Sequence, residues 1–393
     1  DFKEIPDASA NFFVAGELAY FTAHDSLFRT DGTAAGTIFL RSGFDFFGEF
    51  MEFKDLLIFI VIRPEAPREI WRSDGTASGT YLLRSSPSFD LIVFGVAGGY
   101  FYFAAGDEVA GSEIFRSDGT SAGTFLLKDI NPGGGASHSA FPKPLAAVGD
   151  HFYFSANDGV HGTELWKTDG SASGTAIVKD INPGPSDGIV DHNDWYGGPY
   201  VNGYLESKAT SFTNRLYFTG TNPDTGEEPW VSDGTAVGTI LLKDLIPGED
   251  SPGPIEFSGT LAGSLYFFSS RIINPDSEYF TIESDFWVTD GTAAGTVKLR
   301  SFQPCALCTF TGGYFIFNNR YYFFIKEQDY EGNSRDILYA SDGTLTGTVP
   351  VYALAAGGIF MGENNGQLVF FDVGNYSNTA LYRTDGTVTG TQV

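Results

Sequence analysis

Short alternating runs of hydrophobic and polar residues, broken by glycine-rich turns, recur along the whole chain. In the clearest stretch, from Phe141 to Ile181, the period-two alternation and the turn signals mark four strands, PLAAVG, HFYFSA, TELWKT and AIVKDI. Similar second strands occur as YFYFAA, RLYFTG, SLYFFS and RYYFFI, and no segment shows sustained helical periodicity. The pattern predicts an all-β chain of about 32 strands with no helix of consequence.

One turn motif punctuates these strands eight times: an aromatic residue, a variable position, Ser or Thr, Asp-Gly-Thr, two variable positions and Gly-Thr, with one departure at Ser171. The intervals between copies, 43 to 64 residues, are typical of four-stranded propeller blades. We therefore predict a single domain over residues 1–393, an eight-bladed β-propeller. The aspartates of the motif are Asp31, Asp74, Asp118, Asp169, Asp233, Asp290, Asp342 and Asp385.

These aspartates have a structural interpretation, because Asp and Thr oxygens bond neighbouring backbone N–H groups and Gly supplies the positive φ of tight hairpins. Eight metal sites are the alternative. An aromatic residue stands three positions before each Asp, which suits packing between neighbouring blades. These aromatic residues are Phe28, Trp71, Phe115, Trp166, Trp230, Trp287, Tyr339 and Tyr382.

The two chain ends resemble complementary fragments of one blade. The last copy stops at GTQV, where other copies continue into a fourth strand such as LLKDI, and the first residues, DFKEIP, resemble that strand with a register offset of about one residue. We predict a ring closed by N- and C-terminal strands in one blade, so that no open sheet edge remains. An open array within a longer chain is the alternative.

The net charge of −26 arises from 49 Asp and Glu against 23 Lys and Arg. Such a field repels phosphate backbones and anionic membrane surfaces, so we expect no nucleic-acid partner. No apolar run is long enough to span a bilayer, so we expect no membrane insertion. The chain opens at Asp1 without a signal-peptide pattern, which favours a mature, processed protein.

The segments TELWKTDGSASGT and EIWRSDGTASGT resemble the ELWxxDGT repeats of bacterial secreted and surface proteins. The resemblance covers all eight units. It implies an extracellular or cell-surface β-repeat protein and brings no assigned catalytic residues. Trp230, Trp287 and Tyr339 follow Pro229, Phe286 and Leu338, so these three copies depart from the Glu-Leu-Trp portion.

Nearly all length variation falls on one face, in the loops between second and third strands and between successive blades, whereas the Asp-Gly-Thr turns lie on the other face. The longest insertion, about 182–208, combines aromatic rings with carboxylates in a manner suited to a glycan or a peptide. Alternatively, its aromatic residues cover the top of the propeller. The candidate ligand-binding residues are Asp191, His192, Asp194, Trp195, Tyr196, Tyr200 and Tyr204.

Candidate metal ligands lie on the same face, although no tight histidine spacing supports them. They are His138, Asp158, His161, Asp191 and His192. The DINPG segments at 129–133 and 180–184 resemble part of an oxygen-ligand calcium loop, with Pro-Gly turns as the alternative. We expect that the protein requires no cofactor. Calcium is the ion that the DINPG segments could bind. Cys305 and Cys308 are expected in a loop, either as a disulfide or as two thiols.

The sequence contains no nucleophile elbow, phosphate-binding glycine loop or HExxH motif. We therefore favour a binding or scaffolding module whose partner is a glycan, a surface polymer or an extracellular protein. The rival interpretation is a glycan-acting hydrolase or lyase that uses paired carboxylates near the central channel.

Overall fold

A computed structural model shows two compact units, Asp1–Gly188 and Ile189–Val393. The structure describes residues 8–44, 46–63, 65–87, 91–133, 138–189, 209–248, 251–273, 281–305, 307–328, 334–354, 357–373 and 379–393. In this part of the chain, regular structure consists of 31 strands, and no helix is long and apolar enough to cross a lipid bilayer.

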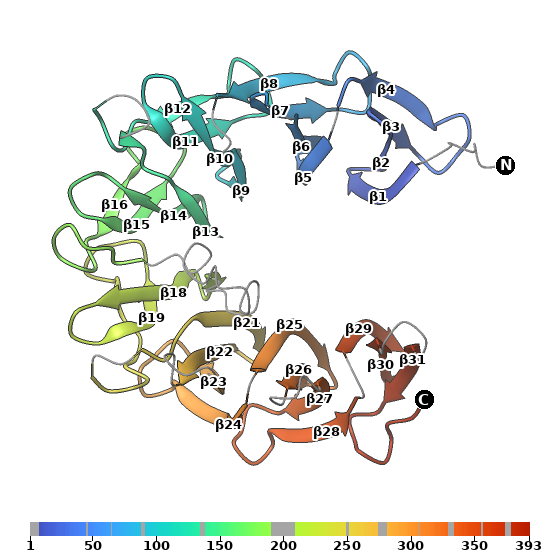
Figure 1. Cartoon of the computed structure of the whole chain (residues 1–393), viewed down its shortest axis with the longest axis vertical. Coiled ribbons are helices and arrows are strands. Elements are labelled where there is room, and N and C mark those ends of the chain that lie inside the picture. Colours follow the sequence, from blue (N-terminus) through green and yellow to red (C-terminus); the bar gives the residue numbers. More distant parts are fainter. Residues whose placement is uncertain are drawn as a thin grey trace. The chain divides into compact units, whose positions relative to one another are not determined.

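The first unit contains four antiparallel sheets, each of four strands in chain order (Figure 1). Sheet 1 comprises β1 (Ala8–Ala15), β2 (Leu18–Ala23), β3 (Ser26–Thr30) and β4 (Ile38–Ser42); sheet 2 comprises β5 (Phe46–Phe53), β6 (Leu56–Ile62), β7 (Arg68–Ser73) and β8 (Tyr81–Ser86). Sheet 3 comprises β9 (Ile92–Ala97), β10 (Tyr100–Asp107), β11 (Gly111–Ser117) and β12 (Phe125–Lys128); sheet 4 comprises β13 (Lys143–Val148), β14 (His151–Asn157), β15 (Thr163–Thr168) and β16 (Ala176–Lys179).

The second unit repeats this arrangement. Sheet 5 comprises β17 (Thr210–Phe212), β18 (Arg215–Asn222), β19 (Gly226–Ser232) and β20 (Ile240–Leu241); sheet 6 comprises β21 (Ile255–Leu261), β22 (Ser264–Ile273), β23 (Thr281–Thr289) and β24 (Val297–Cys305). Sheet 7 comprises β25 (Leu307–Phe317), β26 (Arg320–Gln328), β27 (Ser334–Ser341) and β28 (Val349–Ala353). Sheet 8 has three described strands, β29 (Gly357–Asn364), β30 (Gln367–Val373) and β31 (Thr379–Thr384).

The prediction of an all-β chain built from eight sheets is confirmed, and the four strands predicted within 141–181 correspond to β13–β16. Beyond β31, the described residues add a single bridge between Arg383 and Gln392. Residues 1–6, which we expect to complete sheet 8, lie outside the described residues. The single domain and the ring closure stay predictions.

The expected loop around the two cysteines is wrong, because Cys305 ends β24 and Cys308 lies in β25. Cys305 is in register with Ile282, and Cys308 with Glu327. The turn-forming proline and the break in alternation suggested a loop, but ladder pairing in two successive sheets carries the strands through this segment.

Within each unit, the core lies between successive sheets, where hydrophobic side chains from both sheets pack together. The fixed aromatic residue belongs to this packing, as predicted: Trp71 packs between sheets 1 and 2, Phe115 between sheets 2 and 3, and Trp166 between sheets 3 and 4. Trp287 and Tyr339 do the same in the second unit. Large aromatic rings suit this layer because each one removes a large apolar area from water.

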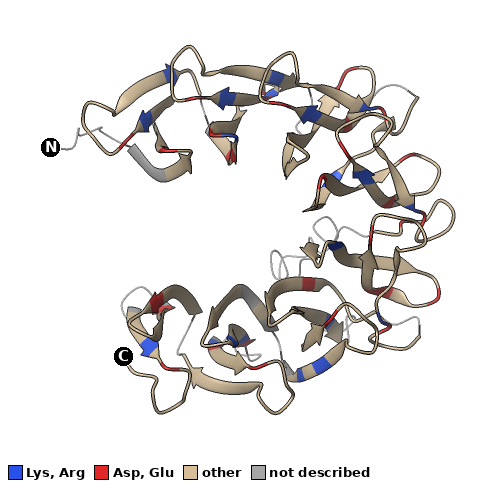
Figure 2. Cartoon of the chain, turned by 180° about the vertical axis from the view of Figure 1, so that it is seen from behind, with Lys and Arg blue, Asp and Glu red and all other residues tan. Residues whose placement is uncertain are grey.

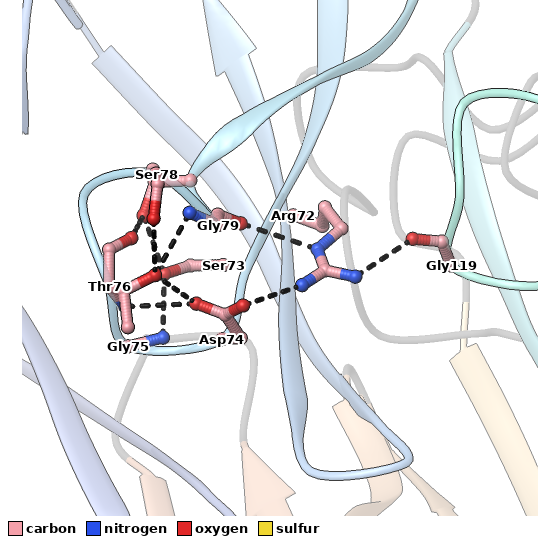
Figure 3. Close-up of polar contacts among 9 residues, drawn as sticks. Arg72, Ser73, Asp74, Gly75, Thr76, Ser78, Gly79 and Gly119 are labelled. Atoms are coloured by element: carbon pink, nitrogen blue, oxygen red, sulfur yellow. Dashed lines mark hydrogen bonds and ion pairs between the residues drawn. The ribbon is translucent and has the colours of Figure 1, made fainter.

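The Asp-Gly-Thr turn is a closed set of hydrogen bonds (Figure 3). Asp74 Oδ1 accepts from the Thr76 N–H at 3.0 Å and from the Thr76 hydroxyl at 2.7 Å, and Thr76 Oγ1 accepts from the Gly79 N–H at 2.9 Å. The Thr80 hydroxyl donates to the Thr76 carbonyl. All eight copies make these contacts, and Ser171 replaces Thr without loss. In exposed copies such as Asp31, hydrogen bonds from Thr33 lower the pKa of the carboxyl.

Two glycines of the turn are required by their surroundings. A Cβ at Gly79 would lie 2.0 Å from Asp74 Oδ1, and the other seven copies show the same close approach. Gly75 has φ +83°, and a Cβ there would also meet Leu18 Cδ1 of the preceding sheet at 2.4 Å. The turn is therefore both a closed hairpin and a contact between neighbouring sheets.

We expect Gly79→Ala to lower the free energy of unfolding by about 2 kcal/mol or more, because the added methyl displaces the Asp74 carboxylate and breaks the turn. Urea denaturation measures the change. Gly357→Ala is the matched control, since a Cβ at Gly357 meets no atom within 4 Å. Equal effects of the two substitutions would contradict the role given to this glycine.

Candidate functional site

Residues 190–208, which make up most of the insertion expected to bind a ligand, lie outside the described residues. The site formed by Asp191, His192, Asp194, Trp195, Tyr196, Tyr200 and Tyr204 therefore stays a prediction. The described loops of the same face include those of sheets 2 to 4. Lys and Arg lie mostly on strands, as most of the described Glu residues do, whereas Asp recurs in the turns and loops (Figure 2).

Two of the candidate metal ligands are brought together in the loop between β14 and β15. Asp158 Oδ2 lies 2.8 Å from His161 Nδ1, while Asp158 Oδ1 accepts hydrogen bonds from the Val160 and His161 N–H groups. Burial raises the pKa of the Asp158 carboxyl, but these hydrogen bonds outweigh that effect and lower it. The hydrogen bond to Asp158 raises the pKa of His161. Asp158 thus fixes the conformation of the loop between β14 and β15.

The remaining metal candidates do not join this pair in the described structure. His138 lies against Gly133 in the connection between sheets 3 and 4, and Asp191 and His192 lie outside the described residues. Within the described ranges, no group of three or more His, Cys, Asp or Glu side chains has a geometry that could hold a metal ion. The metal site stays a prediction.

The DINPG segments are held by buried glutamates. Glu113 Oε2 accepts from the Ile130 N–H at 2.9 Å, and Glu164 Oε2 accepts from the Ile181 N–H at 2.8 Å. Glu228 does the same for Leu245 at the start of the next connection. Each glutamate is completely buried. In these three copies, the Glu of the Glu-Leu-Trp portion thus fixes the start of the connection on the variable face, a role that sequence reasoning missed.

Burial raises the pKa of Glu113 and of Glu164 to about 7, and that of Glu228 to about 8. The neighbouring Asp129, Asp180 and Asp244 add to this increase, whereas the accepted backbone hydrogen bonds oppose it. The protonated form of each buried carboxyl is therefore favoured over most of the acidic range.

The aspartates beside the buried glutamates are the described residues that bear on the expectation of calcium binding. Asp180 and Asp244 each keep a buried Oδ1 atom without a hydrogen-bond partner. The Asn182 amide, however, donates to the Asp187 carbonyl, as expected of a turn residue. Calcium stays an expectation, and the described contacts are those of a hydrogen-bonded turn.

An open cavity of about 490 Å³ lies between sheets 2 and 3 on the variable face. It is lined by Pro67, Arg84, Ser85, Pro87, Asp107, Glu108 and Val109. The guanidinium carbon of Arg84, in β8, lies 4.1 Å from the centroid of the Phe115 ring, and Arg84 Nη2 donates to Asp107 Oδ2 at 3.0 Å. The volume falls within the usual range of small-ligand sites.

In the loop between β10 and β11, Asp107 makes the same backbone hydrogen bonds as Asp158 makes in the loop between β14 and β15. Asp107 Oδ1 accepts from the Val109 and Ala110 N–H groups, as Asp158 Oδ1 does from Val160 and His161. Because Ala110 stands where sheet 4 has His161, the second oxygen of Asp107 is left for Arg84. The hydrogen bonds from Val109 and Ala110 and the ion pair with Arg84 together lower the pKa of the Asp107 carboxyl.

Comparison with known proteins gives resemblances of fold at low identity. No family model matches the chain, and no curated protein sequence matches it. Solved structures that resemble it include polysaccharide lyase Uly1, at 12% identity and TM-score 0.41, with 95% of this chain and 97% of that chain covered. A prolyl endopeptidase, at 11% identity and TM-score 0.42, is matched over 96% of this chain and 55% of its own length. No functional conclusion follows from likenesses of this size.

The buried glutamates predict a pH dependence of stability. A carboxyl whose pKa is about 7 when folded and about 4 when unfolded stabilises the fold fully below about pH 4, and this stabilisation is lost as the pH rises through about 7. The amide side chain of Glu164→Gln cannot ionise. Between about pH 5 and pH 8, we therefore expect the free energy of unfolding of this variant to decrease by roughly 2 kcal/mol less than that of the unchanged protein.

Urea denaturation at the two pH values measures this difference. The exposed Glu17→Gln is the matched control and should leave the pH dependence as it is. Parallel pH profiles for Glu164→Gln and the unchanged protein would contradict the assignment.

Proposed function

We propose that this protein is a secreted or cell-surface β-propeller that binds a glycan, a surface polymer or an extracellular protein through its variable face. The observation that carries the proposal is the difference between the two sets of loops. The Asp-Gly-Thr turns use nearly all of their polar groups within themselves. The opposite loops hold the insertion at about 182–208 and the cavity between sheets 2 and 3.

Binding is favoured over catalysis because four of the carboxylates that the structure describes on this face have structural partners. Glu113 and Glu164 hold backbone N–H groups, and Asp107 and Asp158 hold their own loops. A glycosidase needs two carboxyl groups that face one substrate across a defined gap. A hydrolase or lyase is therefore the second interpretation.

The resemblance to ELWxxDGT repeats and the charge of −26 are consistent with an extracellular setting. The charge also disfavours a nucleic-acid partner, and the proposal requires neither a cofactor nor insertion into a membrane.

A glycan array, combined with an assay for release of reducing sugar, tests the proposal on the full chain. We expect binding without turnover. Trp195→Ala should weaken binding about tenfold or more and leave the melting temperature nearly unchanged, because losing a central tryptophan typically costs about 2 kcal/mol or more. Turnover that a single carboxylate substitution abolishes would favour the enzyme. A sharp fall in melting temperature with intact binding would make the insertion a cover for the propeller.

We also propose that the ring closes through sheets 1 and 8, with residues 1–6 as the fourth strand of sheet 8. One face of sheet 1 carries a row of phenylalanines, Phe12, Phe21, Phe28 and Phe39, whose neighbouring ring centroids lie 5.4 to 5.7 Å apart. This row lies outside the hydrophobic cluster that joins sheets 1 and 2, and Phe12 and Phe39 are 64% and 51% exposed.

Sheet 8 offers a complementary apolar face. Ile359, Phe371 and Leu381 are in register across its three strands, and they lie outside the cluster that joins sheets 7 and 8. These two apolar faces, one on the first sheet of the first unit and one on the last sheet of the second unit, support the proposal of closure, because contact between them would remove both from water.

We expect Phe39→Asp to lower the free energy of unfolding by about 2 kcal/mol or more, since closure buries that position. Ile240→Asp is the matched control, because Ile240 is also a fourth-strand residue and is 49% exposed. Urea denaturation compares the two variants. Closure through this face would be wrong if both substitutions had the same small effect.

A further inference from the structure

Arg84 departs from a contact that four other fourth-strand cations make. Arg41, Lys128, Lys243 and Arg300 stand at the same position, four residues after the Gly-Thr threonine. Each donates to the carbonyl of that threonine in the next sheet: Arg41 to Thr80, Lys128 to Thr175, Lys243 to Thr296 and Arg300 to Thr348. Arg84 instead donates to Asp107, at the cavity between sheets 2 and 3.

Because Arg84 donates to Asp107 and not to a threonine carbonyl, its guanidinium is held at the wall of an open cavity. The Phe115 ring supports the guanidinium from one side, and Asp107, itself held by the Val109 and Ala110 N–H groups, fixes its Nη2 edge. Within the described residues, Arg84 forms no hydrogen bond other than the one to Asp107. Its Nε is buried, so the remaining Nη donors are those available to a molecule in the cavity, at little cost in side-chain ordering.

The rest of the lining defines what such a molecule is. The exposed Glu108 supplies carboxylate acceptors, Ser85 supplies a hydroxyl, and Pro67 and Pro87 supply apolar walls. A pair of neighbouring hydroxyl groups can accept from a guanidinium and donate to a carboxylate, while the carbon face of the molecule lies on the prolines.

Charge selects against ionic ligands. Asp107 already neutralises Arg84, Glu108 adds a negative charge, and the whole chain carries −26. An anionic ligand would meet net repulsion, and a cationic one would be attracted by Glu108 but would leave the Arg84 donors without an acceptor.

We propose that this cavity binds a neutral, hydroxyl-rich sugar unit, with Arg84 as donor, Glu108 as acceptor and the two prolines as the apolar wall. This inference rests on the proposed function and adds a defined subsite to it, apart from the insertion at about 182–208.

The test uses the full chain on an array of neutral oligosaccharides, with uronate-containing oligosaccharides as the anionic arm. We expect binding to neutral glycans, reduced about tenfold or more by Arg84→Ala, because hydrogen bonds to a charged donor are among the strong ones. Arg41→Ala is the matched control and should leave binding unchanged, since Arg41 occupies the same repeat position but donates to Thr80.

A second variant guards against loss of stability in Arg84→Ala. Val109 is 75% exposed and lines the cavity, so Val109→Trp should fill it and abolish binding while the Arg84–Asp107 pair stays in place. The inference is overturned if only uronate-containing glycans bind, if neutral glycans bind equally to the unchanged protein and to both cavity variants, or if no glycan binds. Binding lost in Trp195→Ala but kept in the cavity variants would retain the proposed function and reject this subsite.

Discussion

The carboxylate of the turn aspartate is the group on which the repeat depends. It accepts the backbone N–H and the hydroxyl of the residue two positions later, and that hydroxyl then accepts the N–H of the second glycine. Because the carboxylate lies so close to this glycine, no side chain fits there. One short motif therefore fixes the conformation of the turn without help from elsewhere in the chain, and eight copies can differ in nearly everything else.

The same turn joins each sheet to its neighbour. The first glycine of the turn lies against side chains of the preceding sheet, such as Leu18 against Gly75. Fourth-strand cations reach forward to the next sheet, as Arg41 does over the Trp71 ring and toward Thr80. Packing and directional contacts therefore recur at the same offset along the chain. This regularity leaves the opposite loops free to vary, because they are held by a separate device, the buried glutamates that bind the connections.

Sequence reasoning succeeded where the determinant is local and failed where it is spatial. Alternation and turn residues located β13–β16, since strand and hairpin propensities act within a few residues. The role of Glu164 was missed because its partners, Ile181 and Asn182, follow it by 17 and 18 residues and meet it only when the fourth strand pairs. The D-x-V-x-G spacing shared by the loops at Asp107 and Asp158 was the one available signal that these loops are alike. The partner of the second carboxylate oxygen was beyond prediction, because Arg84 comes from a neighbouring sheet.

In a repeat protein, each position can be compared with the equivalent position in the other copies. This comparison shows which departures from the repeat pattern are informative. When a repeated position keeps its residue type but changes its partner, local propensity has not changed, so the cause lies in the surroundings. Arg41 and Arg84 are such a pair: the same side chain at the same offset bonds a threonine carbonyl in one case and a loop carboxylate in the other. The carbonyl contact strengthens the junction between sheets, and giving it up at one junction removes that contribution. What the molecule gains there is a positioned cation beside an open cavity, which is a feature of recognition rather than of folding.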